Sequence, residues 1–481
     1  MNFVIPSFAP AVPEMVLLAL ISTILIADTF WSKRFQFATY YATQISLIVV
    51  GFIIISSFAT VQVITFDGSF VRDSFSDVLK LFALAVSFGV FFFAREYLQQ
   101  HKFFSGEFFV LGLFGVLGMF VMISAHNMIT MYLGLEIMSL AIYAMVALRK
   151  DSANALEAAL KYFVLGALAT GMLLYGFSMI YGATGSITFP EIASIIGAGK
   201  ADSVVLSFGV VFVVIGLAFK LGAVPFHMWV PDVYHGSPTA VTMFLATAPK
   251  IAAFAMLYRL LAEAMPDLIA DWQSLIIMLS VLSMAVGAVV AIVQDNLKRM
   301  LAYSGIGHMG FLLLGVIAAT PDGYASAMFY VVIYAITGVA GFGMIAALSR
   351  TGKEFDLVAD FKGLNARNPW LAFMMMMIMF SMAGVPPFVG FWAKLLVIEE
   401  VVQAGFLWLA VLAVVVAVIS AFYYLKVIKA MYFDKPEDNT RLEPINGTLT
   451  IGVSAIAILL LVLGLLPGSM IDIFFFSLNA A

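Results

Sequence analysis

Runs of apolar residues about as long as a bilayer is thick, separated by short polar segments, recur along the whole chain. A helix of about 20 apolar residues crosses the hydrocarbon core of a membrane. The pattern therefore predicts an all-α integral membrane protein, a single polytopic domain over residues 1–481 with fourteen spans and no soluble domain. The predicted spans cover residues 11–30, 38–59, 75–94, 108–124, 127–148, 157–183, 204–223, 238–262, 272–293, 299–319, 325–349, 370–402, 406–431 and 448–467.

Prolines interrupt two of these spans, the seventh and the twelfth. Proline has no backbone N–H, and its ring clashes with the carbonyl four residues before it. Pro225 therefore frees the carbonyl of Leu221. Pro386 and Pro387 free two further carbonyls, including that of Ala383. Because broken backbone at membrane depth is tolerated only where it is buried in protein or lines a wet cavity, both breaks are candidate functional positions.

The two broken spans hold matching places in two groups of five, spans 4–8 and 9–13, in which each is the fourth. Five is an odd number, so the second group must cross the membrane in the opposite direction. Inverted repeats with matched broken helices point to a transport site near the midplane; two unrelated proline kinks are the alternative. The chain then divides into three N-terminal spans, a first repeat, an inverted second repeat and a C-terminal span, at residues 1–104, 105–263, 270–432 and 445–481.

Cationic residues gather in alternate loops. With the N-terminus outside, the outward-facing loops carry only Arg72, Lys200 and Arg259. The inward-facing loops carry the much larger set Lys33, Arg34, Arg95, Lys102, Arg149, Lys150, Lys298, Arg299, Arg350, Lys353, Lys362, Arg367, Lys429, Lys435 and Arg441. This bias follows the positive-inside rule. It predicts a multi-pass protein of the bacterial inner membrane, or of a related energy-converting membrane, with both termini on the periplasmic side.

Four charged residues lie well inside the predicted spans: Glu136, Lys220, Lys250 and Lys394. A charge at the bilayer centre costs about 2.5–3.5 kcal/mol even on the lenient insertion scale, and such residues normally face the bundle interior or water. Helical spacing places Ser139 on the same face as Glu136. These side chains are therefore expected inside the bundle.

Three other lysines, Lys80, Lys161 and Lys426, lie near span ends, where their ammonium groups can snorkel to the headgroups. Lys80 is also one helical turn from Asp77, which suggests a local ion pair. Histidines supply further titratable groups. His308 follows Ser304 by one turn in span 10; His227 and His235 flank the broken half of span 7 and are candidates to line an access path; His101 and His126 are expected at the loop surface or membrane interface.

A row of lysines with a glutamate and a histidine can relay protons. Burial disfavours a charged lysine and a nearby carboxylate favours it, so a lysine balanced between the two can exchange a proton near neutral pH. Moving one charge then changes the proton affinity of the next site. The alternative is that the buried groups form inert structural ion pairs.

Composition narrows the chemistry further. Hydrophobic residues make up 63% of the chain and charged residues 11%. The net charge is -4, which does not suggest nucleic acid as a partner. There are no cysteines, which excludes disulfides and cysteine-ligated iron–sulfur clusters in this chain. The five histidines include no pair with metal-ligand spacing such as HExxH. Any redox cofactor is therefore expected on another subunit.

Three segments resemble the antiporter-like membrane subunits of respiratory complex I, the proton-translocating NADH–quinone oxidoreductase. They are PFHMWVPDVYHGSPTAVTMFLATAPK at 225–250, QDNLKRMLAYSGIGHMG at 294–310 and GVPPFVGFWAKL at 384–395. The likeness extends over nearly the whole chain. Lysine at position 394 favours one subunit type over its sisters, in which a glutamate is usual. Where the family commonly has an acidic or amide residue, this chain has His235, so the resemblance assigns that position no role.

The resemblance implies a role for each member of the row. Glu136 and Lys220 correspond to a glutamate and a lysine that face each other, with Lys161 beside them. Lys250 corresponds to the central relay lysine, Lys394 to the exit-side lysine and His308 to a bridge between these two. The implied function is proton translocation as part of a translocase, in contact with other membrane subunits, sister antiporter-like subunits among them, and with lipids. NADH, FMN, iron–sulfur clusters and quinone would be bound by other subunits.

Two other functions remain open from the sequence. One is a subunit of a multi-subunit cation/proton antiporter or of a membrane-bound hydrogenase, which use related chains. The other is a structural membrane scaffold whose buried ion pairs are inert.

Overall fold

The computed structural model describes residues 5–31, 37–350, 353–435 and 447–479. Within these ranges, thirteen helices are long and apolar enough to cross a membrane. The predicted span 370–402 consists of two shorter helices, α16 (Pro369–Ala383) and α17 (Val389–Gln403). Counted as one broken crossing, they complete the fourteen predicted spans. Of the loop cations, Lys33, Arg34 and Arg441 lie outside the described residues.

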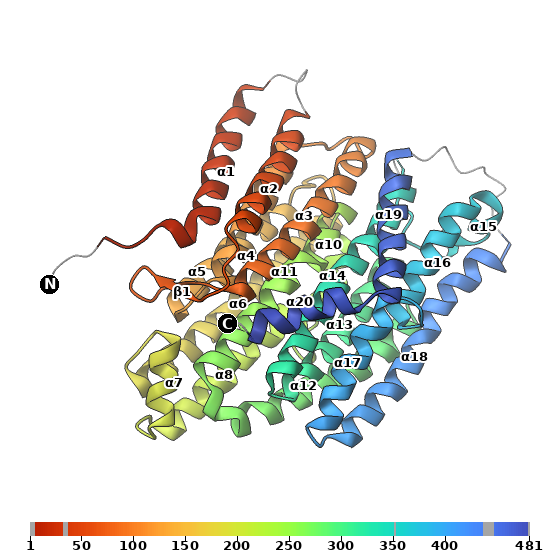
Figure 1. Cartoon of the computed structure of the whole chain (residues 1–481). Coiled ribbons are helices and arrows are strands. Elements are labelled where there is room, and N and C mark those ends of the chain that lie inside the picture. Colours follow the sequence, from red (N-terminus) through yellow and green to blue (C-terminus); the bar gives the residue numbers. More distant parts are fainter. Residues whose placement is uncertain (1–4, 32–36, 351–352, 436–446, 480–481) are drawn as a thin grey trace.

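The N-terminal part contains three spans and a short hairpin (Figure 1). Its elements are η1 (Ala9–Ala11), α1 (Val12–Phe30), α2 (Ala38–Ser56), β1 (Val63–Thr65), β2 (Phe70–Arg72) and α3 (Ser74–Gln100). The two strands pair antiparallel, with Val63 opposite Arg72. Asp73 then caps α3, because its side chain accepts the backbone N–H of Ser76. The hairpin is a small addition to the predicted all-α architecture.

The two groups of five spans follow, with short connecting helices. The first contains α4 (Gly106–Ile123), α5 (Met128–Val146), α6 (Ala153–Thr184), α7 (Phe189–Gly197), α8 (Ser203–Leu221), α9 (Trp229–Gly236), α10 (Thr239–Ala246), α11 (Ala248–Tyr258) and the π-helix η3 (Arg259–Ala264). After η4 (Pro266–Leu268), the second contains α12 (Ile269–Ile292), α13 (Leu297–Ile317), α14 (Pro321–Leu348), η5 (Val358–Phe361), α15 (Leu364–Arg367), α16, α17 and α18 (Leu407–Tyr432).

Glycines allow the first two helices of each group to approach closely. A Cβ on Gly118 of α4 would lie 2.7 Å from the carbonyl oxygen of Gly134 in α5. A Cβ on Gly287 of α12 would lie 2.7 Å from the Cα of Gly307 in α13. Small residues at the interface are the usual means of tight helix association in membranes. The same device at the same place in both groups agrees with the repeat.

Three crossings lie at the centre of the bundle: α10–α11, α13 and α14. The apolar stretch of α10–α11 is wholly buried, and those of α13 and α14 are nearly so. The outer helices α18 and α19 (Gly447–Leu465) instead expose apolar side chains, among them Val418 and Ile451. The central crossings can therefore hold charged groups away from lipid.

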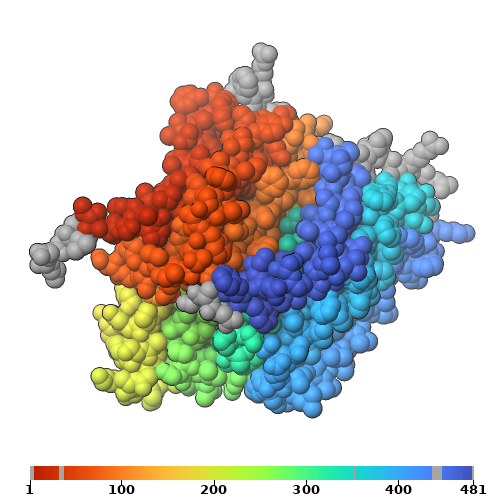
Figure 2. Space-filling view, in the orientation of Figure 1, coloured from red at the N-terminus to blue at the C-terminus, as the bar shows by residue number. Residues whose placement is uncertain are grey.

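The chain ends in α20 (Gly468–Asn479), which lies across the outside of the bundle (Figures 1 and 2). Phe474 stacks on Phe82 of α3, and Ser74 donates to the carbonyl of Ser477. Above α20, a groove of about 690 Å³ runs between α3 and α19 and has an almost wholly apolar lining. This face fits the predicted contact with membrane lipids.

Candidate functional site

The two proline breaks have the same backbone geometry. α8 ends at Gly222 with φ 76° and α16 ends at Gly384 with φ 84°, the left-handed region that glycine adopts without strain. In each, two N–H groups bond back to carbonyls of the last turn, as in a Schellman motif. The bonds after Val224 and Pro386, which lead into Pro225 and Pro387, are both cis. The sequence-predicted breaks are thus matched in structure.

Lys250 fills the first break. Its ammonium group donates to the carbonyl of Leu221 at 2.9 Å and to that of Lys220 at 3.0 Å. The same ammonium lies 5.3 Å from the centre of the Trp229 ring. The carbonyl that Pro225 was predicted to free is therefore bound by the central lysine. A cation at a half-helix C-terminus is also favoured by the helix dipole.

Lys394 fills the second break in the same way. Its ammonium group donates to the carbonyl of Ala383 at 2.7 Å, one of the two that the prolines were predicted to free. The lysine comes from the second half of the same span, α17, whereas Lys250 comes from the neighbouring span. Lys394 also lies 5.2 Å from the centre of the Phe311 ring. Both repeats therefore place one buried ammonium group on the C-terminus of a broken helix.

The break beside Lys250 lies next to a third interruption that the sequence analysis missed. Span 8 was predicted as one helix, but it divides at Thr247, with φ -120° and ψ -87°, into α10 and α11. Pro249, directly before Lys250, was the available signal, because a proline in the first turn marks a helix start. The division places Lys250 in the first turn of a new half-helix.

Ser139 connects Lys220 to α5. The ammonium group of Lys220 donates to the Ser139 hydroxyl at 2.9 Å, and that hydroxyl donates to the carbonyl of Leu135. Glu136 lies on the same face of α5, one turn from Ser139, and is partly buried. Within the described chain, Glu136 and Lys220 have no ion pair within 4.0 Å. Lys220 therefore binds the face of α5 that carries Glu136, through a serine one turn away from that glutamate.

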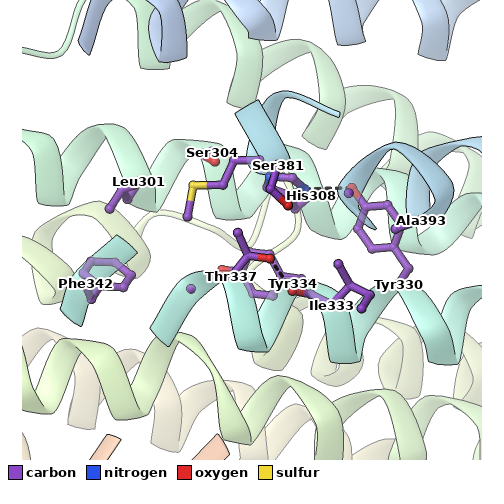
Figure 3. A pocket seen from close by; sticks show the side chains of 13 residues that line it. Leu301, Ser304, His308, Tyr330, Ile333, Tyr334, Thr337, Phe342, Ser381 and Ala393 are labelled. Carbon is purple, nitrogen blue, oxygen red and sulfur yellow. Dashed lines mark hydrogen bonds between the residues drawn. The ribbon is translucent and has the colours of Figure 1, made fainter. Parts of the chain in front are cut away.

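His308 lies between two tyrosine hydroxyls beside a cavity of the second repeat, and Figure 3 shows the one from Tyr330. Its Nδ1 is 2.7 Å from the Tyr330 hydroxyl, and its Nε2 is 3.0 Å from the Tyr424 hydroxyl. The Tyr424 hydroxyl continues to Ser304 at 2.5 Å. Because a neutral imidazole has one donor and one acceptor nitrogen and each hydroxyl can act as either, this arrangement can pass a proton across the ring.

The cavity beside His308 has a volume of about 30 Å³, enough for a water molecule. Its lining includes the hydroxyl groups of Ser304, Thr337 and Ser381. The Ser381 hydroxyl is buried without a protein partner, as expected for a group that binds water. The cavity therefore offers a small polar space in the centre of the second repeat.

This cavity lies between the two capped breaks. Gly338 in its wall touches span 8, since a Cβ there would lie 2.8 Å from the Thr247 methyl group, one turn before Lys250. On the other side, Ala393 lines the cavity next to Lys394. Lys220, Lys250, His308 and Lys394 thus follow one another through the buried middle of the bundle.

Lys161 is placed differently. Its side chain is 41% exposed, and its ammonium group lies 2.8 Å from Glu157 and 2.8 Å from Asp232. Arg299 binds the other oxygen of Asp232. Among the described residues, Lys161 has no hydrogen bond with Glu136 or Lys220, so its part in the row stays a prediction. A cavity of about 110 Å³ beside it is lined by His235, in agreement with an access position for that histidine.

Two expectations for the N-terminal spans were wrong. Lys80 does not snorkel and does not pair with Asp77: it is fully buried and its ammonium group lies 2.6 Å from Glu14 of α1. Asp77 binds Arg72 instead, at 3.1 Å. Tertiary contacts between α1, α3 and the hairpin override the one-turn spacing. Lys426 does reach the edge of the bundle, where it binds Asp295 at 3.1 Å.

Two loop histidines are also more buried than expected. The side chain of His101 is 5% exposed and lies 3.9 Å from Glu354. His126 is 6% exposed, and the ring of Phe189 lies 6.2 Å from its own. Loop segments from distant parts of the sequence cover both rings, which hydropathy cannot indicate.

Comparison with known proteins gives consistent matches over the whole chain. Residues 125–420 match the family described as NADH:quinone oxidoreductase/Mrp antiporter, TM. The NADH-quinone oxidoreductase subunit N of Hydrogenovibrio crunogenus is 72% identical over 478 residues, 99% of this chain and 100% of that one. A chain of respiratory complex I from Thermus thermophilus with bound aureothin is 31% identical with a TM-score of 0.82, covering 96% of this chain and 98% of that one.

A more distant match concerns the fold alone. A chain of the Mrp complex from Dietzia sp. has a TM-score of 0.85 at 20% identity, covering 98% of this chain and 97% of that one.

Proposed function

The chain belongs to the family of membrane subunits shared by NADH:quinone oxidoreductase and Mrp antiporters, and on that premise we propose that it serves as subunit N of a bacterial NADH–quinone oxidoreductase. In that role it is a translocase subunit that moves protons across the membrane, beside other membrane subunits of the complex. NADH, FMN, iron–sulfur clusters and quinone are bound by other subunits. The absence of cysteine from this sequence agrees with that division of labour.

One observation supports proton transfer above all: a buried lysine caps the broken helix in each repeat. Lys250 and Lys394 donate to carbonyls at the two breaks. A lysine that only stabilised the bundle would gain most from a carboxylate partner. Neither ammonium group has an ion pair with a carboxylate in the described part of the chain, and each rests on neutral carbonyl dipoles. Such a lysine can lose its proton without leaving a carboxylate unpaired.

The row works through neighbouring charges. The Lys250 ammonium contacts the backbone of Lys220, so a proton on one lysine disfavours a proton on the other. A proton displaced from Lys250 has the His308 cavity on one side, and Lys394 lies beyond it. Glu136 lies at the far end of the row, one turn from the Ser139 that binds Lys220. Protonation changes imposed at one end by the redox reaction can therefore propagate along Glu136, Lys220, Lys250, His308 and Lys394, with Lys161 as a surface branch.

The orientation in the membrane is part of the proposal. The cationic loops face the cytoplasm, and both termini lie on the periplasmic side of the inner membrane. The positive-inside bias of the sequence supports this orientation.

Replacement of Lys220 tests the proposal. In Lys220→Met the charge disappears while most of the side-chain volume stays, so the fold is retained. We expect NADH-driven proton pumping to fall at least about tenfold, equivalent to about 1.4 kcal/mol in the transfer barrier. The measurement is the initial rate of acidification of inverted membrane vesicles that contain the assembled complex.

Lys429→Met is the matched control, because that lysine is 67% exposed in the last turn of α18, where it pairs with Asp434. Normal pumping and turnover by the Lys220 variant in an intact complex would show that the buried lysine is inert and that the chain is a scaffold.

Ser139→Ala tests the link between Lys220 and α5. The variant removes the hydroxyl that accepts a hydrogen bond from the Lys220 ammonium group. A hydrogen bond to a charged group contributes about 1.5–3 kcal/mol to stability. We expect a three- to tenfold slower pumping rate with normal assembly. Ser178→Ala is the control, since its hydroxyl makes the same kind of bond to a carbonyl one turn back but on an exposed face. Equal rates for both variants would remove Ser139 from the path.

A further inference from the structure

A polar cluster at one end of α10 contains a carboxylate that the row of relay residues does not include. Glu354 lies between α14 and η5, and the hydroxyl of Tyr97 in α3 donates to its Oε1. The hydroxyl of Thr239, the first residue of α10, donates to its Oε2 at 2.9 Å. The Thr239 backbone N–H also donates to the Tyr97 hydroxyl at 3.2 Å. Glu354 is thus joined to the start of the half-helix that leads to Lys250.

Glu354 connects the surface with the interior. Its side chain is 24% exposed, whereas Tyr97 and Thr239 are fully buried. The cluster lies on the side of the bundle where the cationic loops gather: Lys298 donates to the carbonyl of Ser237, two residues before Thr239, and Arg350 is four residues before Glu354. The carboxylate therefore has water on one side and the buried start of α10 on the other.

Several charged and titratable groups face this carboxylate. They are Tyr97 of α3, His101 directly after that helix, Lys298 of α13, and Lys353 and Asp356 from the segment of Glu354 itself. Two further groups interact electrostatically with these neighbours: Arg149 with Lys298, and His235 with Lys298 and Asp356. Burial alone would raise the pKa of Glu354, but Lys298 and the hydrogen bond from Tyr97 hold that pKa below its usual range. Glu354 is therefore ionised at neutral pH, and its carboxylate has an oxygen within reach of water on the exposed side.

Two buried polar atoms beside the cluster have no protein partner. They are His101 Nε2, which is 3.9 Å from the Glu354 carboxylate, and the hydroxyl of Ser237, whose carbonyl accepts the Lys298 ammonium. Buried polar groups are nearly always hydrogen-bonded, to water where no protein group is available. A separation of 3.9 Å between His101 Nε2 and the carboxylate is too long for a direct hydrogen bond. Water that satisfies these two atoms is therefore expected beside Glu354.

Polar groups continue from the cluster toward Lys250. The distance along the helix axis from Thr239 to Lys250 is about 16 Å at 1.5 Å per residue. Thr242 and Thr247 lie between, and each donates its hydroxyl proton to a backbone carbonyl, which leaves the oxygen able to accept. The helix is interrupted at Thr247, so backbone groups there do not take part in the regular helical hydrogen bonds.

We propose that Glu354 is the carboxylate that takes up protons from the aqueous phase for Lys250, at the loop-side end of span 8. A proton from water binds a carboxylate oxygen of Glu354. The proton then passes to a water molecule on the inner side of the cluster and, along the threonines of α10, to the neutral amine of Lys250, while Glu354 returns to its ionised form. This inference rests on the proposed function, because it requires Lys250 to accept protons.

The matched variant is Glu354→Gln. A glutamine can accept a hydrogen bond at one atom and donate one to a hydroxyl at the other, so the connection to Tyr97 and Thr239 is kept and only the protonatable carboxylate is lost. We expect about fivefold slower NADH-driven proton pumping at pH 8 in vesicles with the assembled complex. The deficit should shrink toward pH 6, where protons are more abundant and uptake is less limiting.

Asp295→Asn is the control. Its carboxylate is 88% exposed on the same side of the bundle and binds Lys426, so its loss should leave the rate and the pH profile unchanged. A wild-type rate and pH profile for Glu354→Gln, with a loss only in Glu354→Ala, would show that Glu354 merely ties α10 to α3 and would overturn the proposal.

Thr239→Val provides a second route if Glu354→Gln fails to assemble. The substitution keeps the side-chain shape and removes only the hydroxyl that donates to Glu354. We expect a two- to threefold lower pumping rate at pH 8, with a deficit that shrinks toward pH 6 as in Glu354→Gln. A pumping rate and pH profile equal to those of the unmodified complex would count against the proposal. Lys250→Met measured in parallel separates the two proposals. If that variant loses pumping while Glu354→Gln does not, only the uptake role fails; if neither loses pumping, the relay itself fails.

Discussion

Replacement of Lys250 by methionine is expected to abolish most proton pumping, with a rate at least about thirtyfold below that of the unmodified complex. Lys250 holds the first break together: two half-helix carbonyls accept from its ammonium, and the Trp229 ring lies beside it. Without the ammonium, both carbonyls at the first break lose their charged donor. The proton path is also cut at its centre, between Lys220 and the His308 cavity. A thirtyfold loss corresponds to about 2 kcal/mol in the barrier.

Lys250→Arg separates the structural contribution from proton transfer. An arginine keeps a permanent positive charge that can cap the carbonyls, but its guanidinium does not release a proton in proteins. We expect Lys250→Arg to assemble as well as the unmodified chain and to pump almost as poorly as Lys250→Met. Pumping restored by arginine would show that the charge at the helix break is enough and that Lys250 does not exchange protons. The readout is acidification of inverted vesicles, normalised to the amount of assembled complex.

Replacement of Arg259 by methionine is expected to produce the largest loss of stability. Arg259 and Asp73 are both fully buried, and the guanidinium donates to both Asp73 oxygens, at 2.9 and 2.8 Å. Arg259 also donates to Glu263 at 2.5 Å. Removal of the cation leaves Asp73 buried without its charged partner, and the loss of one member of a buried pair costs about 3–5 kcal/mol. Because the protein functions in a complex, the measurement is the amount of chain assembled in membranes and the temperature at which it leaves the purified complex.

The double variant Asp73→Asn with Arg259→Met supplies the test of cause. With the fully buried carboxylate of Asp73 removed as well, and only the partly exposed Glu263 left beside position 259, most of the single variant's loss should be recovered. Lys200→Met, an exposed cation on the same predicted side, is the control and should assemble normally. An Arg259→Met chain that assembles and survives heating like this control would show that the buried pair contributes little.

The helix breaks could be predicted in detail because their cause is local. Pro225 and Pro387 lack a backbone N–H whatever the surrounding fold, and the carbonyl that each frees lies four residues before it in the sequence. The structure adds what the sequence did not predict, that the carbonyls of Leu221 and Ala383 accept hydrogen bonds from Lys250 and Lys394. The break at Thr247 was equally local, and Pro249 could have indicated it. Pro249 lies in the middle of the predicted span 238–262, directly before Lys250.

The candidate site was predictable in membership but not in arrangement. A lysine in the middle of an apolar span has to face protein or water, so Lys220, Lys250 and Lys394 could be selected without any structure. Which acceptor each binds could not be selected in this way. Ser139 is separated from Lys220 by 81 residues, and Tyr424 from His308 by 116, and no periodic pattern connects such pairs.

The sequence by itself determined the spans, the two matched breaks, the freed carbonyls and the buried lysines on which the proposed role rests. The physical reason is that each follows from one segment and its solvent: the length of an apolar run, the missing N–H of proline, and the cost of a charge in lipid. Only the tertiary structure decided that Lys250 crosses to the break in the neighbouring span and that Lys80 turns inward to Glu14. It alone placed Glu354 at the start of α10. These contacts depend on how distant helices lie against one another, and the free energy of a buried charge is set by whichever partner that arrangement brings to it.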